Sequence, residues 1–305
     1  MRLSDTEVVD TFAEAFPMWG ARIVITAESP GWAHEAARSL TGFATSVIGC
    51  KCEAGIEREL DPAETPDGRP GASALLFAGD REGLAKRLVE RIGQSVLTCP
   101  TTACFNGLDA PETVDVGGQL RFFGDGYQAS KVLDGRRYWR VPVMEGEFLV
   151  EERFAIAEGV AGGNIIILSR DVVGALRAAE AAAAAMRTVR DVILPFPGGI
   201  ARSGSKVGSR YSGLVASTNE SLCPTLRAQV PHTDVPPDVG SVLEIVIDGL
   251  TLEAVRDAMA RGLEAAARAG ASHVTAGNYG GNLGPYHIDL RGLVPGLLDD
   301  SEAVI

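Results

Sequence analysis

A repeated strand–helix–strand pattern constrains the fold of this chain more than any other feature of its sequence. Runs of β-branched residues alternate with segments of helical periodicity, and the alternation occurs twice in each half of the chain. In the first half the segments are 21–27, 31–40, 43–49, 72–78, 80–92 and 95–99. In the second half they are 164–168, 171–187, 191–194, 242–247, 252–269 and 272–276. Each half therefore reads βαββαβ, which predicts an α+β fold of two ferredoxin-like lobes, each an antiparallel sheet with helices on one face.

The segment between the halves, residues 117–150, contains more strand formers than helix formers. The runs LRFF, YWRVPV and EFLV are separated by turn residues at 124–126 and at Asp134-Gly135. We therefore predict an inserted antiparallel β segment here. The predicted domains are an N-terminal lobe, residues 1–155, which carries the insertion, and a C-terminal lobe, residues 156–305.

Two long loops, 53–71 and 195–240, occupy equivalent positions between the strand–helix–strand pieces of each half. They are rich in Pro, Gly, Ser and Thr, and loops of this length are uncommon unless they are functional or disordered. Because apolar residues are scattered through them and they contain no low-complexity repeats, we expect ordered loops that carry site residues.

Charge and hydropathy exclude two classes of protein. The 305 residues include 28 Lys and Arg against 40 Asp and Glu, and the acidic excess is spread along the chain, so binding to nucleic acid is not expected. No apolar run approaches the roughly 20 residues that span a bilayer. Residues 1–10 are acidic and lack the pattern of a signal peptide, which predicts a cytoplasmic protein.

Metal and nucleotide chemistry lack their usual sequence signals. The histidines are far apart, and neither HExxH, GxGxxG, GxxxxGK[ST] nor GxSxG occurs. The five cysteines are odd in number and widely spaced, as is typical of reduced thiols. Cys50 and Cys52 read as the end of a strand with both sulfurs on one face, where a buried apolar pair is favoured over a metal site. We predict no metal and no tightly bound cofactor.

Glu244 is the most informative single residue. It lies in the run SVLEIVID, whose other central members are all apolar. A carboxylate at this position is either solvated on a half-exposed sheet face or buried. Burial would favour the neutral acid and raise its pKa, which produces a group able to donate a proton near pH 7. The pattern alone leaves both interpretations open.

Several glycine-rich turns offer backbone N–H groups to a ligand, although each is also explained as a tight turn. These turns lie at 123–127, 162–164, 197–199 and 277–281. Hydroxyls, amides and Lys206 gather in the loop at 203–209 and 217–219. Their composition suits hydrogen bonding to a polar cofactor, and a solvated loop has the same composition.

Seven segments together carry a resemblance to a known family. They are DTFAEAF (10–16), TPDGRPG (65–71), FFGDGYQ (122–128), GVAGGN (159–164), PFPGG (195–199), SKVGS (205–209) and ASTN (216–219). The chain resembles the formylmethanofuran:tetrahydromethanopterin formyltransferases from about residue 10 to residue 290. The resemblance implies a cytosolic, two-lobed homotetramer without metal or prosthetic group, whose counterpart in methylotrophic bacteria is a subunit of a formyltransferase/hydrolase complex. The tail after Leu290 departs from the archaeal pattern.

The resemblance also implies a reaction and a site. The family moves a formyl group between tetrahydromethanopterin and the primary amine of methanofuran, and Glu244-Ile245-Val246 matches the strand glutamate that is the family's proposed acid. We expect direct attack of the amine in a ternary complex. The motifs and their polar side chains further indicate candidate substrate-binding residues: Arg69, Asp125, Tyr127, Asn164, Lys206, Ser209, Asn219 and Asn278. The alternative is a noncatalytic subunit that binds a pterin or furan cofactor for a partner enzyme.

Overall fold

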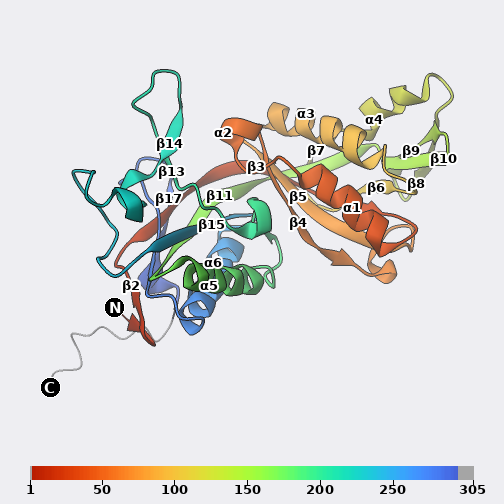
Figure 1. Ribbon diagram of the computed structural model, residues 1–305. Coiled ribbons are helices and arrows are strands. Elements are labelled where there is room, and N and C mark those ends of the chain that lie inside the picture. The colour runs from red at the N-terminus through yellow and green to blue at the C-terminus, as the bar shows by residue number, and fades with distance from the viewer. Residues whose placement is uncertain (1, 295–305) are drawn as a thin grey trace. The chain divides into compact units, whose positions relative to one another are not determined.

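The computed structural model describes residues 2–294, and the chain divides into two compact units (Figure 1). One unit consists of residues 17–159. The other joins the first 16 residues to the segment that begins at Val160. Two long strands, β3 (Phe12–Thr26) and β11 (Arg153–Ser169), contribute to both units. The predicted boundary between residues 155 and 156 therefore falls inside β11, and the N-terminal segment groups with the C-terminal half of the chain.

The unit of residues 17–159 is built on an antiparallel sheet whose strands follow the order β6, β3, β5, β4. Helices α1 and α3 cover this sheet, and they bury Ala36, Leu40, Leu84 and Leu88 against it. The bounds are α1 Pro30–Thr41, β4 Glu53–Leu60, β5 Gly71–Ala78, α3 Arg81–Arg91 and β6 Ala103–Asn106. These four strands are antiparallel to one another, whereas β6 pairs in parallel with β10 (Gly146–Glu151) on its other side.

The other unit has a sheet with the corresponding order β16, β11, β15, β12, again antiparallel throughout. Helices α5 and α6 pack on each other and on β15, and their small residues, such as Ala179 and Ala266, are fully buried in this contact. The bounds are α5 Val172–Met186, β12 Val192–Ile193, β15 Ser241–Gly249, α6 Leu252–Arg268 and β16 His273–Thr275. At the sheet edges, β2 (Thr6–Val8) pairs with β1 (Arg2–Leu3) and β16, and β17 (Tyr286–Asp289) pairs with the start of β3.

Local chemistry explains where the main helices begin. The side chains of Ser29, Asp80, Asp171 and Thr251 each accept a hydrogen bond from a backbone N–H in the first turn of α1, α3, α5 and α6, respectively. Such caps satisfy donors that have no partner within the helix. The helices predicted at 31–40, 80–92, 171–187 and 252–269 are therefore confirmed, to within a few residues.

The segment 117–150 is antiparallel β structure from residue 129 onward. Strands β8 (Ala129–Leu133), β9 (Arg136–Val143) and β10 (Gly146–Glu151) form two consecutive hairpins. The LRFF run is not a strand, because it lies in α4 (Gly117–Leu120) and in the 3₁₀ turn Arg121–Gly124. At Gly117 the chain passes close to β10, since a Cβ there would lie 2.3 Å from the Glu151 carbonyl oxygen. The short strand β7 (Glu112–Asp115) pairs with β11.

Two predicted strands of the first half are wrong. Residues 43–49 contain the turn into α2 (Val47–Cys50), which Ser46 caps, and only Thr45 makes an isolated bridge. Residues 95 and 96 end a π-helical turn, Ile92–Val96, that continues α3, residues 97–99 are a turn, and the strand β6 begins at Ala103. The predicted loop 53–71 is shorter than expected, since its first eight residues form β4.

The cysteine motif differs from its predicted geometry in the same region. Cys50 ends α2 and is partly exposed, whereas Cys52 is buried, so the two sulfurs do not form a buried pair at a strand end. Lys51 between them has a left-handed backbone, with φ of 66°, which separates the two side chains. Within residues 2–294, no helix is long and apolar enough to cross a membrane.

Candidate functional site

Glu244 lies in the middle of β15, with backbone partners on both sides. Across one edge it faces Ile166 of β11. Across the other edge its N–H and C=O exchange hydrogen bonds of 2.9 and 2.7 Å with Ala201, in the loop that follows β12. The 195–240 loop is therefore joined to the sheet at the glutamate itself.

The alternation of β15 sends Glu244 away from the helices. Ile245 and Ile247 are fully buried in the core beneath α5 and α6, so Glu244 points to the opposite face of the sheet. That face is not open, because Val235 and Val239 of the loop pack there against Ile166 and Leu168. Glu244 itself is half-buried. The solvated strand glutamate that the sequence pattern left open does not describe this side chain.

The burial of Glu244 has a direct electrostatic consequence. Removal from water disfavours the charged carboxylate, and it raises the pKa of Glu244 from 4.5 to about 7. A carboxyl group with this pKa is protonated in a large fraction of molecules at neutral pH. It can donate a proton and take one back in the same cycle.

Asn164 lies on the same face of the sheet, two residues along β11 from Ile166. Its side-chain amide donates hydrogen bonds of 3.1 Å to the carbonyls of Gly162 and Gly277, and its Oδ1 accepts one of 2.6 Å from the Gly277 N–H. The side chain is almost completely buried. Asn164 therefore fixes the start of the turn that follows β16, a structural task that occupies the whole amide.

A second buried glutamate, Glu14 of β3, organises the rest of that turn. Its carboxylate accepts hydrogen bonds from the backbone N–H groups of Tyr279, Gly281, Leu283 and Gly284, and the side chain is 1% exposed. Burial alone would raise the pKa of Glu14, but these four hydrogen bonds together lower it below its ordinary value. Glu14 therefore stays ionised and holds the turn.

Asn278 completes the same turn. Its amide donates to Thr11 Oγ1 and to the Phe12 carbonyl, at 3.0 and 3.2 Å, and its Oδ1 accepts the Gly280 N–H. The next residue, Tyr279, remains partly exposed. Sequence reasoning named Asn278 as a substrate contact and missed both Glu14 and Tyr279. The signal for Glu14 was present, since it is a lone acid in the apolar run FAEAF.

Three predicted residues lie in the 195–240 loop. This loop contains the two-stranded hairpin of β13 (Ser205–Val207) and β14 (Ala216–Thr218). Lys206 forms an ion pair with Glu220, which lowers the pKa of that glutamate. Ser209 accepts a hydrogen bond from the Tyr211 N–H, and Asn219 accepts one from the Ser221 hydroxyl. All three side chains thus contribute to local loop structure.

The other three predicted residues belong to the unit of residues 17–159. The Arg69 guanidinium is bonded to Asp67, to the Thr101 carbonyl and to Thr26, so it anchors the loop between β4 and β5. Asp125 has a left-handed backbone after the turn at 121–124, and Tyr127 is strongly exposed just beyond it. These exposed side chains are available to a ligand.

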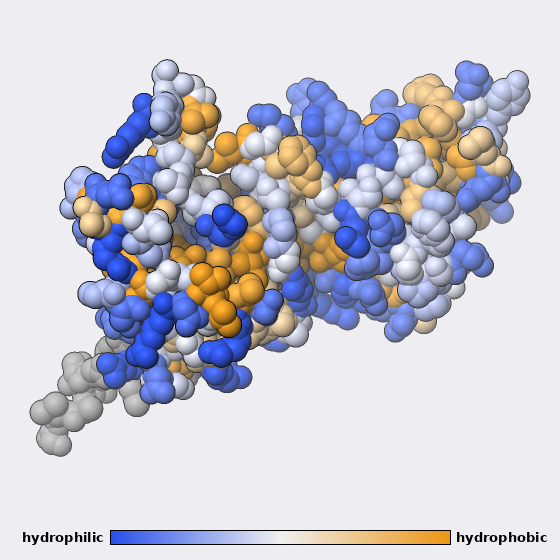
Figure 2. Space-filling model, in the orientation of Figure 1, coloured by the Kyte–Doolittle hydropathy of each residue, from blue (hydrophilic) through white to orange (hydrophobic). Residues whose placement is uncertain are grey.

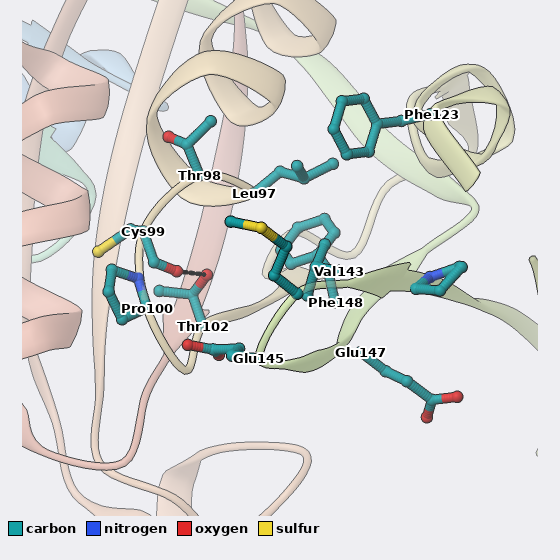
Figure 3. A pocket seen from close by; sticks show the side chains of 12 residues that line it. Leu97, Thr98, Cys99, Pro100, Thr102, Phe123, Val143, Glu145, Glu147 and Phe148 are labelled. Carbon is teal, nitrogen blue, oxygen red and sulfur yellow. Dashed lines mark hydrogen bonds between the residues drawn. The ribbon is translucent and has the colours of Figure 1, made fainter. Parts of the chain in front are cut away.

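This unit also contains a cavity of about 740 Å³ between the π-helical turn and the β9–β10 hairpin. Figure 3 shows Leu97, Phe123 and Phe148 around it. The cavity has two acidic neighbours with partners of their own, because Glu145 accepts the Thr101 N–H and Glu147 pairs with Arg140. None of the predicted site residues lines it. The predicted acid, Glu244, lies elsewhere, on β15, where its backbone is hydrogen-bonded to the 195–240 loop.

Among residues 2–294, no group of three or more His, Cys, Asp or Glu side chains is placed to hold a metal ion.

Comparison with known proteins gives a consistent result over nearly the whole chain. The family model described as formylmethanofuran-tetrahydromethanopterin formyltransferase matches residues 1–143, and the model of its proximal lobe matches residues 146–293.

Individual proteins agree with the family models. A relative from Methylococcus capsulatus named formylmethanofuran–tetrahydromethanopterin formyltransferase is 55% identical, over 95% of this chain and 99% of its own length. The solved formyltransferase of Methanosarcina barkeri has a TM-score of 0.92 at 47% identity, with 96% of this chain and all of the other chain covered. A chain of the formyltransferase/hydrolase complex of Methylorubrum extorquens, solved with methylofuran, has a TM-score of 0.93 at 51% identity, with 96% of this chain and 98% of that chain covered.

Proposed function

The chain belongs to the formylmethanofuran–tetrahydromethanopterin formyltransferase family, and we infer from this premise that it transfers a formyl group between tetrahydromethanopterin and the primary amine of methanofuran or a related furan cofactor. Both cofactors are substrates that enter and leave. The observation in the structure that supports this reaction is the half-buried Glu244, whose carboxyl group has a pKa of about 7.

The reaction transfers a proton from one nitrogen to the other, with no net uptake or release of protons. The attacking nitrogen forms a bond to the formyl carbon as the carbonyl π electrons move to oxygen. When the carbonyl re-forms, the bond to the leaving nitrogen breaks, and that nitrogen takes one proton. The attacking nitrogen releases one proton, so a single group that donates and then accepts balances the exchange. We assign this role to Glu244. Holding both substrates together supplies the remaining advantage without a covalent formyl-enzyme.

The other predicted site residues fall into two groups, those that we propose contact substrate and those that we propose hold loops. Asp125 and Tyr127 are exposed and Lys206, Ser209 and Asn219 lie in the loop bonded to Glu244, so we propose them as substrate contacts. The amides of Asn164 and Asn278 and the guanidinium of Arg69 are engaged by protein groups. We therefore propose that these three act through the loops they hold.

A two-substrate assay tests the function. The purified protein receives formyl-tetrahydromethanopterin and a furan amine, and formylated amine and free pterin are measured together with formate. We expect transfer without stoichiometric formate, and no effect of a chelator. Glu244→Gln should lower kcat about 100-fold or more while the cofactor affinities stay nearly constant. Full turnover of this variant would remove Glu244 from the mechanism. Cofactor binding without any transfer by the wild type would establish the noncatalytic alternative.

We further propose that the chain assembles as a homotetramer, alone or with partner subunits of a formyltransferase/hydrolase complex. Figure 2 shows apolar surface over α5, where Val172, Val173 and Leu176 are exposed. Exposed apolar patches of this kind mark association surfaces. Val173→Asp should reduce the mass measured by light scattering, and a wild-type protein that is monomeric and fully active at micromolar concentration would contradict the proposal.

Two finer proposals concern the fold of the two lobes and the location of the protein in the cell. The corresponding strand orders of the two sheets, with two helices against each, support the ferredoxin-like description of both lobes. A cytoplasmic location is implied by the family resemblance, and cell fractionation tests it. The part of the tail that departs from the archaeal pattern lies largely outside the described residues.

A further inference from the structure

Arg121 is a half-buried cation in the unit of residues 17–159. It begins the 3₁₀ turn Arg121–Gly124, which packs against β9 next to the buried Leu120. Within residues 2–294 its guanidinium makes no hydrogen bond and no ion pair. The Nε is shielded from water without a partner, whereas the two terminal nitrogens reach solvent. Because buried polar groups are normally paired, an unpaired guanidinium held in an ordered turn needs a physical explanation.

Two aromatic rings hold the guanidinium in place. Its Cζ lies over the ring of Phe122, 4.7 Å from the centroid, and over the ring of Trp139, 4.6 Å from the centroid. Trp139 is itself fixed, because its Nε1 donates a hydrogen bond of 3.2 Å to Glu152. A cation over an aromatic ring is attracted to the ring face. Stacking uses the flat faces of the guanidinium and leaves its N–H groups, which point outward in its plane, without acceptors.

The same unit contains a second stacked arginine, which shows what such an N–H edge binds. The Cζ of Arg81 lies 4.2 Å from the centroid of the Trp19 ring, and a terminal nitrogen of Arg81 donates a hydrogen bond of 2.7 Å to Glu112. An internal carboxylate therefore occupies the edge of that guanidinium. The arginines of β9 also pair with glutamates, and they are Arg136, Arg137 and Arg140. Among the described residues, none supplies a carboxylate to Arg121.

The charges around Trp139 favour an anion. Arg137 lies two residues before Trp139 on β9, so both side chains are on one face of the strand. Arg137 lies 3.5 Å from the carboxylate of Glu152 and donates a hydrogen bond of 2.9 Å to Ser130. Arg121 and Arg137 thus bring two positive charges to this face, against the single negative charge of Glu152. A local positive excess on a chain whose net charge is −12 attracts anions to this place.

We propose that Arg121 is an anion-binding residue, whose terminal N–H groups take a carboxylate or phosphate group of a small-molecule ligand while Phe122 and Trp139 hold the guanidinium. Carboxylate and phosphate share a pair of oxygens that match the two parallel donors of a guanidinium. The rings fix the guanidinium before the ligand arrives, so little side-chain freedom is lost on binding. The site goes beyond the formyl transfer, and nothing in it depends on Glu244.

The test titrates the full-length protein with inorganic phosphate and, separately, with succinate, while sodium chloride keeps the ionic strength constant. Tryptophan fluorescence follows binding, because the guanidinium lies over the Trp139 ring, and the rise in melting temperature with probe concentration gives a second readout. We expect saturable binding of at least one probe, and the tighter probe shows whether the site prefers phosphate or carboxylate. Arg121→Gln should raise the Kd by about 10- to 100-fold. Arg121→Lys keeps the charge without the planar fork and should restore only part of the affinity.

Arg81→Gln is the matched control, because it removes a stacked arginine whose N–H edge is already occupied by Glu112. This variant should bind both probes with the affinity of the wild type. The proposal is wrong if the wild type binds neither probe saturably, or if Arg121→Gln binds them as tightly as the wild type does. An equal loss of affinity in Arg81→Gln would show an effect of net charge alone, which also refutes it. Should Arg121→Gln fail to fold, Arg121→Lys decides, since full affinity in that variant excludes recognition by the guanidinium.

Discussion

Replacing Glu244 by Gln should change how the stability of the protein depends on pH. The carboxyl of Glu244 has a pKa of about 7 in the folded protein and of about 4.5 when solvated. Between these values the folded state binds more protons than the unfolded state, so this residue makes the protein less stable as pH rises. The difference corresponds to about 3 kcal/mol lost between pH 4 and pH 8.5. Gln does not titrate, so this component disappears in the variant.

The expected observation is a pH-dependent difference between two proteins. Any fixed cost of placing an amide at position 244 is the same at every pH and cancels in the comparison. Relative to wild type, the free energy of unfolding of Glu244→Gln should therefore rise by about 3 kcal/mol from pH 4 to pH 8.5. Urea unfolding at constant protein concentration measures it, with Glu180→Gln as the control because Glu180 is exposed on α5.

A difference that stays constant with pH would refute the reasoning, since it would show that Glu244 titrates alike in the folded and unfolded chains. The same result would remove the physical basis for its role as a proton donor near neutrality. The stability measurement therefore tests the site without any substrate. It complements the kinetic assay, in which loss of activity alone does not distinguish a lost proton donor from a disturbed loop.

Two further predictions concern the turn at residues 277–284. Glu14→Gln should lower the melting temperature at pH 7 and weaken the loss of stability in acid, because the pKa of Glu14 is lowered on folding and its contribution is present above the unfolded pKa and lost as pH falls through the folded one; calorimetry across the acid range checks this, and a variant that melts like wild type contradicts it. Gly284→Ala should cost about 1–3 kcal/mol of stability, because its Cβ would lie 2.2 Å from the Ala15 carbonyl oxygen, whereas Gly79→Ala meets nothing within 4 Å and should be tolerated; equal urea midpoints would show that the turn is not packed as described.

The sequence predicted the main helices well because each has its own local cause. A capping side chain precedes each of α1, α3, α5 and α6, and apolar or small residues follow at helical spacing. The strand prediction at 95–99 was wrong because it gave the strand propensity of these residues more weight than their helical periodicity. Leu84, Leu88, Ile92 and Val96 are all fully buried at intervals of four residues, so the helical signal continued into the segment taken as a strand.

The strand β4 was missed for a different reason. Its centre carries Glu57, Arg58 and Glu59, which read as a solvated loop. In the structure Glu57 is nearly buried, paired with Arg22 at 2.8 Å and accepting the Ser73 hydroxyl at 2.7 Å. A charged residue inside a sheet is satisfied by partners on neighbouring strands, and those partners are distant in sequence. Local pattern therefore cannot identify it.

The candidate site shows the same limit. Glu244 was recognisable because a single acid interrupts an apolar strand, yet the pattern did not decide between a solvated and a buried carboxyl. The loop at 195–240 joins the strand at Glu244 through Ala201, and its Val235 and Val239 pack on the same face of the sheet against Ile166 and Leu168. Long loops are the least predictable part of a chain, since their contacts do not follow a period. Whether Glu244 is solvated or buried could therefore not be predicted without the fold of this loop.

Glu14 and Glu244 show why a lone acid in an apolar strand is an incomplete functional signal. Both glutamates lie in the same unit, and burial acts on the pKa of each in the same direction. Four backbone N–H groups reverse that effect at Glu14, which is thereby committed to the charged form and to holding a turn. Within the described residues, no comparable set of backbone N–H groups donates to the Glu244 carboxyl group, and its pKa rises to about 7. The hydrogen bonds made by the carboxylate, more than its burial, thus separate a structural acid from one that can exchange protons near neutral pH.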